Sequence, residues 1–167
     1  MSFTNARHIV RSAATLLHAP ATRVFPLLCP VREYDWIPEW RCEMIHSSTG
    51  VIGPDCVFRT QFPGQDTPEI WVVSTHDPEH FRLGFVRVIP ETCVTRMDIR
   101  LEPLGSPEQD ETRLTCVKAL TCLGPSGEAV LDAHTEAFHA KWLDGLTTRL
   151  DHYLATGTMW RPADVPR

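Results

Sequence analysis

Two hydrophobic periods follow each other along this chain, and their order is what most limits the fold. Between about residues 42 and 123, apolar and polar side chains alternate with the period of two that is typical of β-strands. From about residue 126 to residue 156, the period becomes that of an amphipathic helix. A helix with a wide apolar stripe has to bury that stripe against another layer. We therefore predict one α+β domain whose long terminal helix lies on an antiparallel sheet.

Six segments in the first region are predicted strands, because each alternates and turn residues separate the neighbours. They are Cys42–Ser48, Asp55–Phe62, Glu69–Thr75, His80–Val88, Cys93–Pro103 and Thr112–Leu123. The clearest is Cys93–Pro103, where Met97 and Ile99 alternate with Arg96 and Asp98. One face of this strand is apolar and the other is charged, which indicates an antiparallel sheet with one solvated face.

The N-terminal part of the chain is predicted to add one more strand and two short helices. The strand is His8–Leu17, and the helices are Pro20–Phe25 and Val31–Trp36. Pro26 and Pro38 keep both helices short, because proline cannot continue a helix. The sheet would then have seven strands.

The terminal helix is predicted to begin at Ser126 as its N-cap and to run unbroken to about Thr156, just before Gly157. Its inward stripe would contain Leu131, Thr135, Phe138, His139, Trp142, Leu146, Arg149, Leu150 and Tyr153. Such a wide stripe faces a large apolar surface. Residues 157–167 would form a loosely docked tail.

The composition is that of one globular domain spanning residues 1–167. Of the 167 residues, 43% are hydrophobic and 22% are charged, which is enough for one ordinary core. The net charge of -5 argues against nucleic acid as a partner. No run approaches about 18 apolar residues, and the N-terminus lacks an apolar signal region. We therefore expect a soluble, cytoplasmic protein with no membrane association, and a homodimer is left open.

Neither the cysteines nor the histidines predict a metal site, and no cofactor is expected. The six cysteines include no Cys-x-x-Cys pair, and several lie in alternating apolar segments, where free cysteine acts as a small hydrophobe. His134 and His139 would be about 140° apart on one continuous helix, so they could not point at one ion. Phosphate-loop, dinucleotide and nucleophile-elbow motifs are absent from the sequence.

The order of the predicted elements resembles that of the START/Bet v 1-like (SRPBCC) superfamily, in particular its polyketide cyclase/dehydratase-like branch. The segment Cys29–Trp40, with its Trp36-Ile37-Pro38-Glu39-Trp40 sequence, is similar to the passage that leads into the first long strand of that family. The resemblance covers residues 7–156. It implies a helix-grip fold, in which a curved antiparallel seven-stranded sheet wraps around the C-terminal helix. It also implies a cavity for a hydrophobic small molecule, such as an aromatic compound or a lipid.

Within such a fold, the strand alternation and the helix stripe mark the side chains that would line the cavity. The ligand-binding candidates are Trp36, Phe58, Thr60, Trp71, Phe85, Met97, Lys118, Phe138, His139 and Trp142. Packing in an ordinary core is the competing interpretation, because buried aromatic side chains are usually structural. No residue is assigned a catalytic role.

Lys118 and His139 are the two candidates with chemistry of their own. Lys118 shares its parity with Cys116 and Leu120, so strict alternation turns its amine inward, where it could bind a carboxylate or act as a base. A β-bulge near this position would instead expose it, and the cost of burying a charge favours that second interpretation. His139 could orient a ligand or transfer a proton, or it could be a satisfied core histidine.

Three functions agree with these observations. The first is a binder of a hydrophobic or aromatic small molecule between the sheet and the terminal helix. The second is a polyketide cyclase/dehydratase-like enzyme that uses His139 or Lys118 for proton transfer. The third is a protein-interaction module resembling the Hsp90 ATPase activators, acting through its outer sheet face. Polar groups that converge inside would favour the first two, and an exposed apolar patch would favour the third.

Overall fold

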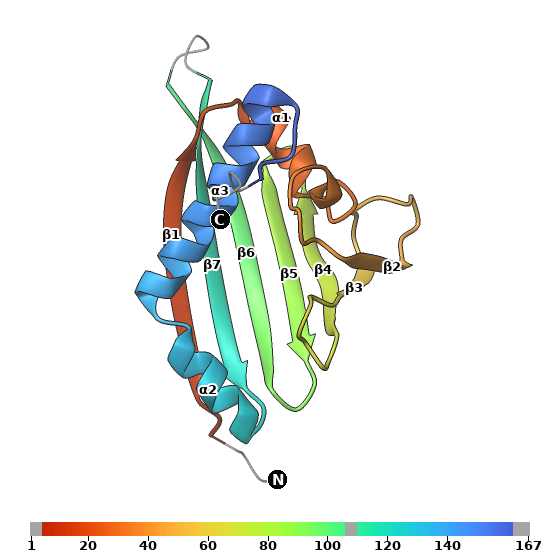
Figure 1. The fold of residues 1–167 in the computed structure, drawn as a ribbon, viewed down its shortest axis with the longest axis vertical. Helices are drawn as coiled ribbons and strands as arrows, with labels where there is room; N and C mark the ends of the chain where they lie inside the picture. The colour runs from red at the N-terminus through yellow and green to blue at the C-terminus, as the bar shows by residue number, and fades with distance from the viewer. Residues whose placement is uncertain (1–4, 106–109, 162–167) are drawn as a thin grey trace, which may run out of the picture.

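Seven strands form one antiparallel sheet in the computed structural model, which describes residues 5–105 and 110–161 (Figure 1). The strands are β1 (His8–Leu17), β2 (Cys42–His46), β3 (Val57–Thr60), β4 (Glu69–Asp77), β5 (Arg82–Ile89), β6 (Cys93–Leu104) and β7 (Glu111–Cys122). Their order across the sheet is β1-β7-β6-β5-β4-β3-β2, so the first strand pairs with the last. The seven predicted strands are confirmed, although β2 and β3 are shorter than predicted.

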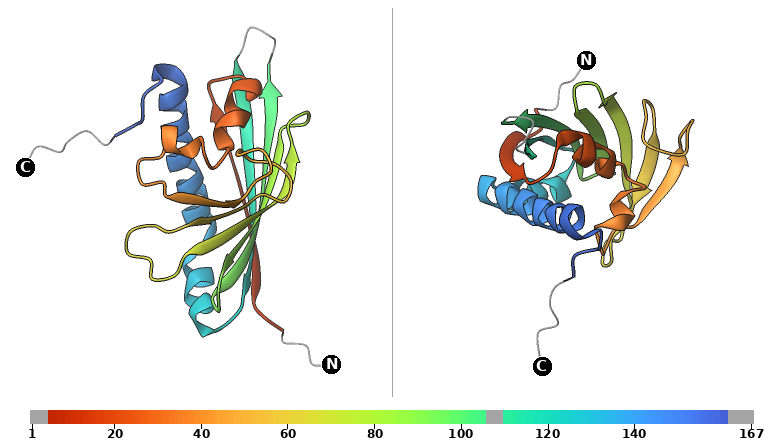
Figure 2. Two further views of the ribbon diagram at one scale, coloured as in Figure 1. Left: turned by 90° about the vertical axis from the view of Figure 1, so that its right-hand side faces the viewer. Right: turned by 90° about the horizontal axis from the view of Figure 1, so that it is seen from above.

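The helices lie on one side of this sheet. Helix α1 (Ala21–Val24) and two 3-10 turns, η1 (Phe25–Leu28) and η2 (Glu33–Asp35), connect β1 to β2, while α2 (Pro125–Ala133) and α3 (Glu136–Thr156) follow β7. Figure 2 shows that the sheet is curved and that α3 runs along its concave side. Among the described residues, no helix is long and apolar enough to cross a membrane. Of the predicted tail, residues 162–167 lie outside the described residues.

The prediction of one unbroken helix after Ser126 is wrong, because the chain forms two helices with a break at His134 and Thr135. Thr135 is the N-cap of α3, and its hydroxyl accepts a hydrogen bond from the backbone N–H of Phe138. His134 is the C-cap of α2, and its carbonyl accepts a hydrogen bond from Arg11 Nε on β1. Ser126 is not an N-cap: it lies inside α2, and its hydroxyl donates to the carbonyl of Glu91. A threonine that caps the second segment, together with a basic side chain that holds the end of the first, stabilises the break.

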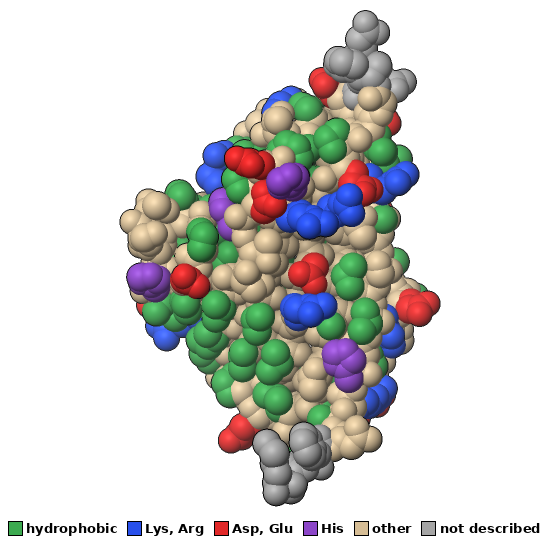
Figure 3. Space-filling model, turned by 180° about the vertical axis from the view of Figure 1, so that it is seen from behind, with side chains coloured by type: hydrophobic (Ala, Val, Ile, Leu, Met, Phe, Trp, Pro, Cys, Tyr) green, Lys and Arg blue, Asp and Glu red, His purple; other side chains and the backbone are tan. Residues whose placement is uncertain are grey.

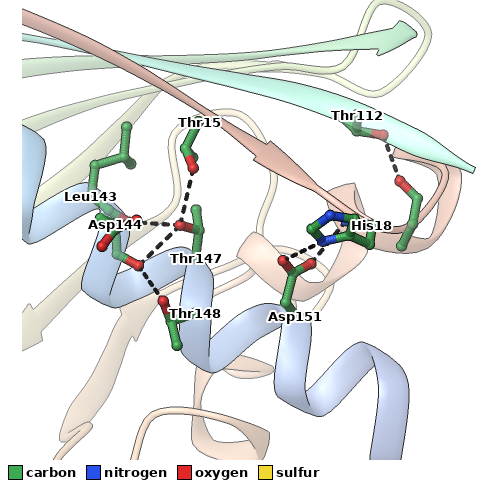
Figure 4. A network of polar contacts seen from close by, with 9 residues as sticks. Thr15, His18, Thr112, Leu143, Asp144, Thr147, Thr148 and Asp151 are labelled. Atoms are coloured by element: carbon green, nitrogen blue, oxygen red, sulfur yellow. Dashed lines mark hydrogen bonds and ion pairs between the residues drawn. The ribbon is translucent and has the colours of Figure 1, made fainter. Parts of the chain in front are cut away.

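Contacts with β1 set the rotation of α3 about its own axis (Figure 4). The hydroxyls of Thr15 and Thr147 lie 3.4 Å apart, and the backbone N–H of His18 donates to Asp151 Oδ1 over 2.9 Å. The His18 ring also lies 3.0 Å from the second oxygen of Asp151. One flank of α3 is therefore tied to the edge strand, and the opposite flank projects over the rest of the concave face.

The passage from Cys29 to Trp40 is part of the core. Trp36 is fully buried and donates its indole N–H to the carbonyl of Leu27, while Trp40 donates to that of Pro30. Both hydrogen bonds are short-range contacts within the connection between β1 and β2. All six cysteines are free, and every one except Cys42 is buried, as the sequence predicts.

The N-cap of α3 gives a first test of this architecture. Thr135→Ala removes the hydroxyl that accepts from Phe138, so we expect the free energy of unfolding to fall by about 1 kcal/mol. Urea denaturation followed by circular dichroism would measure the change. Thr148→Ala, at an exposed position inside the same helix, is the matched control. It should lower the free energy of unfolding by less than Thr135→Ala does. Equal stability of Thr135→Ala and the parent protein would contradict the break as described.

Candidate ligand site beneath the long helix

Lys118 points into the concave side of the sheet. Strands β6 and β7 pair without a register shift from Cys93 opposite Cys122 to Leu104 opposite Glu111, so no bulge turns the lysine outward. The side chain lies in a cross-strand row between Met97 on β6 and Arg11 on β1, and Lys118 is only 7% exposed. The interpretation that a bulge exposes this residue is therefore wrong.

An aromatic ring explains how the amine is accommodated. Lys118 Nζ lies 3.1 Å from the centroid of the Trp142 ring on α3, which is a close cation–π contact. Within the described residues, Nζ has no ion pair and no hydrogen bond with a protein atom. Burial lowers the pKa of Lys118 to about 7, because the charged form loses its hydration, and the charge of Arg87 adds to that effect.

A polar chain on β3, β4, β5 and β6 lies on the same face. Arg87 forms an ion pair with Glu69 at 3.4 Å and donates to the hydroxyl of Thr95 over 3.2 Å. Trp71 donates its indole N–H to Thr60 Oγ1 over 2.9 Å. Glu69, Thr60 and Thr95 are buried. Because Glu69 is paired with Arg87, the charge of Lys118 has no carboxylate partner of its own among residues 5–105 and 110–161.

Three aromatic rings cover the floor beside this polar chain. Phe58 and Trp71 are stacked with centroids 5.6 Å apart, and Phe85 meets both edge-on at 6.1 and 5.8 Å. Met97 is the cross-strand partner of Phe85. The sheet candidates are thus brought together on one face: Phe58, Thr60, Trp71, Phe85, Met97 and Lys118.

On the helix side, His139 holds Trp142 in position. His139 is fully buried, its Nε2 lies 3.0 Å from the carbonyl oxygen of Cys116, and its ring stacks on that of Trp142 with centroids 5.8 Å apart. Desolvation lowers its pKa, and the backbone contact only partly opposes that effect. His139 is therefore a core residue that fixes the ring over Lys118.

His134 lies beside His139, contrary to the prediction from the sequence. Because the helix is broken at this residue, the rings of His134 and His139 come together, with their centroids 5.5 Å apart. On one continuous helix, the two side chains would be separated by about 140° around its axis. Burial lowers the pKa of His134 to about 4, and the nearby positive charges act in the same direction. His134 Nε2 and His139 Nδ1 are both buried without a hydrogen-bond partner. Residues 5–105 and 110–161 contain no group of three or more His, Cys, Asp or Glu side chains arranged to hold a metal ion.

A groove of about 400 Å³ opens beside this cluster. It is lined by one flank of α3: Phe138, Lys141, Trp142, Gly145, Leu146 and Arg149. Thr147 and Asp151, which contact Thr15 on β1 and His18 just after it, project from the opposite flank, so the groove lies on the side of α3 that faces away from β1. Trp142 belongs both to the groove and to the cover over Lys118. It is therefore the side chain that joins the groove to the amine.

Two candidates lie away from the cluster of sheet residues. Phe138 was expected to point inward, but it is 49% exposed and lies at the N-terminal end of the groove. The cause is its place in the first turn of α3, about 100° around the axis from buried His139. Trp36 is buried in the connection between β1 and β2, where its indole N–H is already bonded.

The outer face of the sheet carries a patch of aliphatic side chains, seen toward the lower left of Figure 3. Alternation and register place these partly buried residues on it: Val57, Ile70, Val72, Val86, Val88 and Val94. Ion pairs on the same side of the sheet surround the patch, among them Arg96 with Asp98. An interaction module would use such a surface, and that alternative stays a prediction.

No protein-family model matches the chain, and no curated protein sequence matches it. Solved structures do match in fold. Norcoclaurine synthase from Thalictrum flavum aligns with a TM-score of 0.67 at 14% identity, over 90% of this chain and 88% of that one. The Zhui aromatase/cyclase from Streptomyces sp. R1128 aligns with a TM-score of 0.63 at 15% identity, over 93% of this chain and 100% of that one. The di-domain aromatase/cyclase BexL aligns with a TM-score of 0.64 at 16% identity, over 89% of this chain and 47% of that one.

These comparisons define the class of fold. The chain has the Bet v 1-like helix-grip fold, in which a curved seven-stranded antiparallel sheet holds a long C-terminal helix. The resemblance noted in the sequence is thus confirmed for the fold. At these identities the likeness carries no function, so the argument for a function has to come from the site itself.

The buried amine gives a second test. Because the pKa of Lys118 is about 7 in the folded protein and about 10.4 in an unfolded chain, the unfolded state binds more protons between these values. Stability is therefore lost as the pH falls from about 10 to 7. Lys118→Met, which cannot be charged, should be more stable than the parent protein at pH 6. The difference in free energy of unfolding between Lys118→Met and the parent protein should decrease by about 2–3 kcal/mol between pH 6 and pH 9.

Urea unfolding of both proteins at several pH values would measure this difference. Lys141→Met is the matched control, since it removes the same amine at an exposed position. A constant difference between Lys118→Met and the parent protein from pH 6 to pH 9 would contradict the burial of the amine.

Proposed function

We propose that this protein binds a hydrophobic or aromatic small molecule between the concave face of the sheet and α3. The observation that carries the proposal is the combination of aromatic rings with a few buried polar groups on one face. Phe58, Trp71 and Phe85 form an aromatic cluster on that face, in which Trp71 is only partly buried, while Lys118 and the Arg87–Glu69 pair provide polar groups for directional contacts. Ligand sites are typically apolar surfaces with a small number of fixed polar groups.

The route into the site would start at the groove along α3. Trp142 and Leu146 lie between the groove and the sheet, and both are only partly buried. A ligand that displaces the Trp142 ring would take over its contact with Lys118. Its apolar part would then rest on the aromatic floor formed by Phe58, Trp71 and Phe85.

Proton transfer is the second candidate function, and Lys118 favours it. A base works best when its pKa is near the working pH, and the pKa of Lys118 is about 7. A cyclase or dehydratase that removes a proton beside a carbonyl could use such an amine. His139 fits this role less well, because its Nε2 is already engaged by the Cys116 carbonyl and its ring is fully buried.

Blocking the groove tests the binding proposal. Leu146→Trp fills the groove beside Trp142, so we expect the affinity for the probe 1-anilinonaphthalene-8-sulfonate to fall at least tenfold. Fluorescence titration of the probe would measure the change. Leu123→Trp adds the same ring at an exposed site outside the groove and should leave the affinity unchanged. Equal affinities of Leu146→Trp and the parent protein would contradict the proposal.

A further inference from the structure

Lysine is rare in this chain: one lysine is part of α3, and the other lies on β7 beneath that helix. The sequence has 16 lysines and arginines together, and only Lys118 and Lys141 are lysines. Lys141 lines the groove, and Lys118 lies beneath Trp142, which also lines it. On the concave face, Arg11 and Arg87 provide the other cationic groups near Lys118. In the part of the chain that the structure describes, a primary amine therefore occupies a buried position at which the cation has no carboxylate partner.

The chemical difference between lysine and arginine suggests why a lysine occupies this position. A guanidinium keeps its proton under all ordinary conditions and binds anions in a bidentate manner, so an arginine would suit a site that only recognises an anion. A lysine amine can lose its proton when it is buried, and it then carries a free lone pair. Arg87 pairs with Glu69, whereas Lys118 has no carboxylate partner among the described residues. These observations favour a role that needs a neutral amine.

We propose that Lys118 forms an imine with the carbonyl group of a hydrophobic aldehyde or ketone that enters from the groove along α3. This inference rests on the proposed binding function and adds the chemical class of the ligand. Its geometric basis is that Lys118 is buried, that Nζ has no ion pair or hydrogen bond within the described residues, and that the Trp142 ring 3.1 Å from Nζ itself lines the groove. A flat apolar ligand in place of that ring would bring its carbonyl carbon close to Nζ.

The step balances without a redox partner. The lone pair of the neutral amine attacks the carbonyl carbon, so that a C–N bond forms and the C=O π bond breaks, and one of the two amine protons then passes from nitrogen to oxygen to give a carbinolamine. That hydroxyl then leaves as water, taking the proton that the nitrogen loses. The products are one imine and one water molecule. The apolar surroundings favour the forward step, because they stabilise the neutral amine and offer few groups that would retain water.

Reductive trapping tests the inference. The parent protein is incubated with 2-naphthaldehyde and sodium cyanoborohydride, and the modified residue is identified by peptide mass mapping. We expect Lys118 to be alkylated at least tenfold faster than Lys141, although Lys141 is the more exposed of the two. The rate at Lys118 should rise from pH 6 to pH 8 and then level off, as the amine loses its proton. Leu123→Trp, at an exposed site outside the groove, should keep the labelling of Lys118, and Lys118→Met should lose the fast reaction.

Two further probes separate this inference from the binding proposal. The alcohol 2-naphthalenemethanol has the same ring system and cannot form an imine, so its binding, followed by tryptophan fluorescence, reports the site alone. If the alcohol binds and Lys118 is not trapped faster than Lys141, the imine inference is wrong and the binding proposal stands. If 2-naphthoate binds more tightly than the alcohol and no trapping occurs, Lys118 pairs with anions, which also overturns the inference. If neither the alcohol nor the aldehyde binds, both proposals fail.

Discussion

Lys118 is buried on the concave face because β6 and β7 pair without interruption along their length, which fixes the direction of every side chain between them. A charged amine in that position is costly, and the ring of Trp142 offsets part of the cost from above. Trp142 is in turn held by His139, whose Nε2 lies 3.0 Å from the backbone carbonyl of Cys116 on β7. The helix and the sheet thus contact each other through the Lys118 amine, the Trp142 indole and the His139 imidazole.

This arrangement depends on where α3 begins. Thr135 caps the helix and Arg11 holds the carbonyl of His134, so the break between α2 and α3 lies directly beside the two histidines. Thr147 and Asp151 tie the other flank of α3 to the end of β1. With its start and its rotation both fixed, α3 presents one flank to an open groove. Trp142 connects that groove with the buried amine, so the same ring that contacts Lys118 in the folded state also lines the groove.

Much of this fold could be predicted from the sequence, because the period-two alternation of the strands and the turn residues between them are strong local signals. The inward direction of Phe58, Phe85 and Met97 follows from the same alternation. The helix break could not be found in this way, since Thr135 fits the apolar stripe while acting as a cap, and the contact of Arg11 with His134 joins distant parts of the chain. The burial of Lys118 could not be predicted either, because the cost of burying a charge argues against it and the compensating ring of Trp142 is a tertiary contact. Thr135 followed by acidic Glu136 was the local signal for a helix start that could have been used.

The protonation of the Lys118 amine can be measured directly by NMR. With 13C-labelled lysine in the parent protein, the Cε resonances of only two lysines have to be followed against pH, and Lys118→Met assigns them. The account predicts that the Lys118 signal titrates with a pKa of about 7. A Lys118 signal that titrates near 10.4, the value of a solvated lysine, would contradict the account.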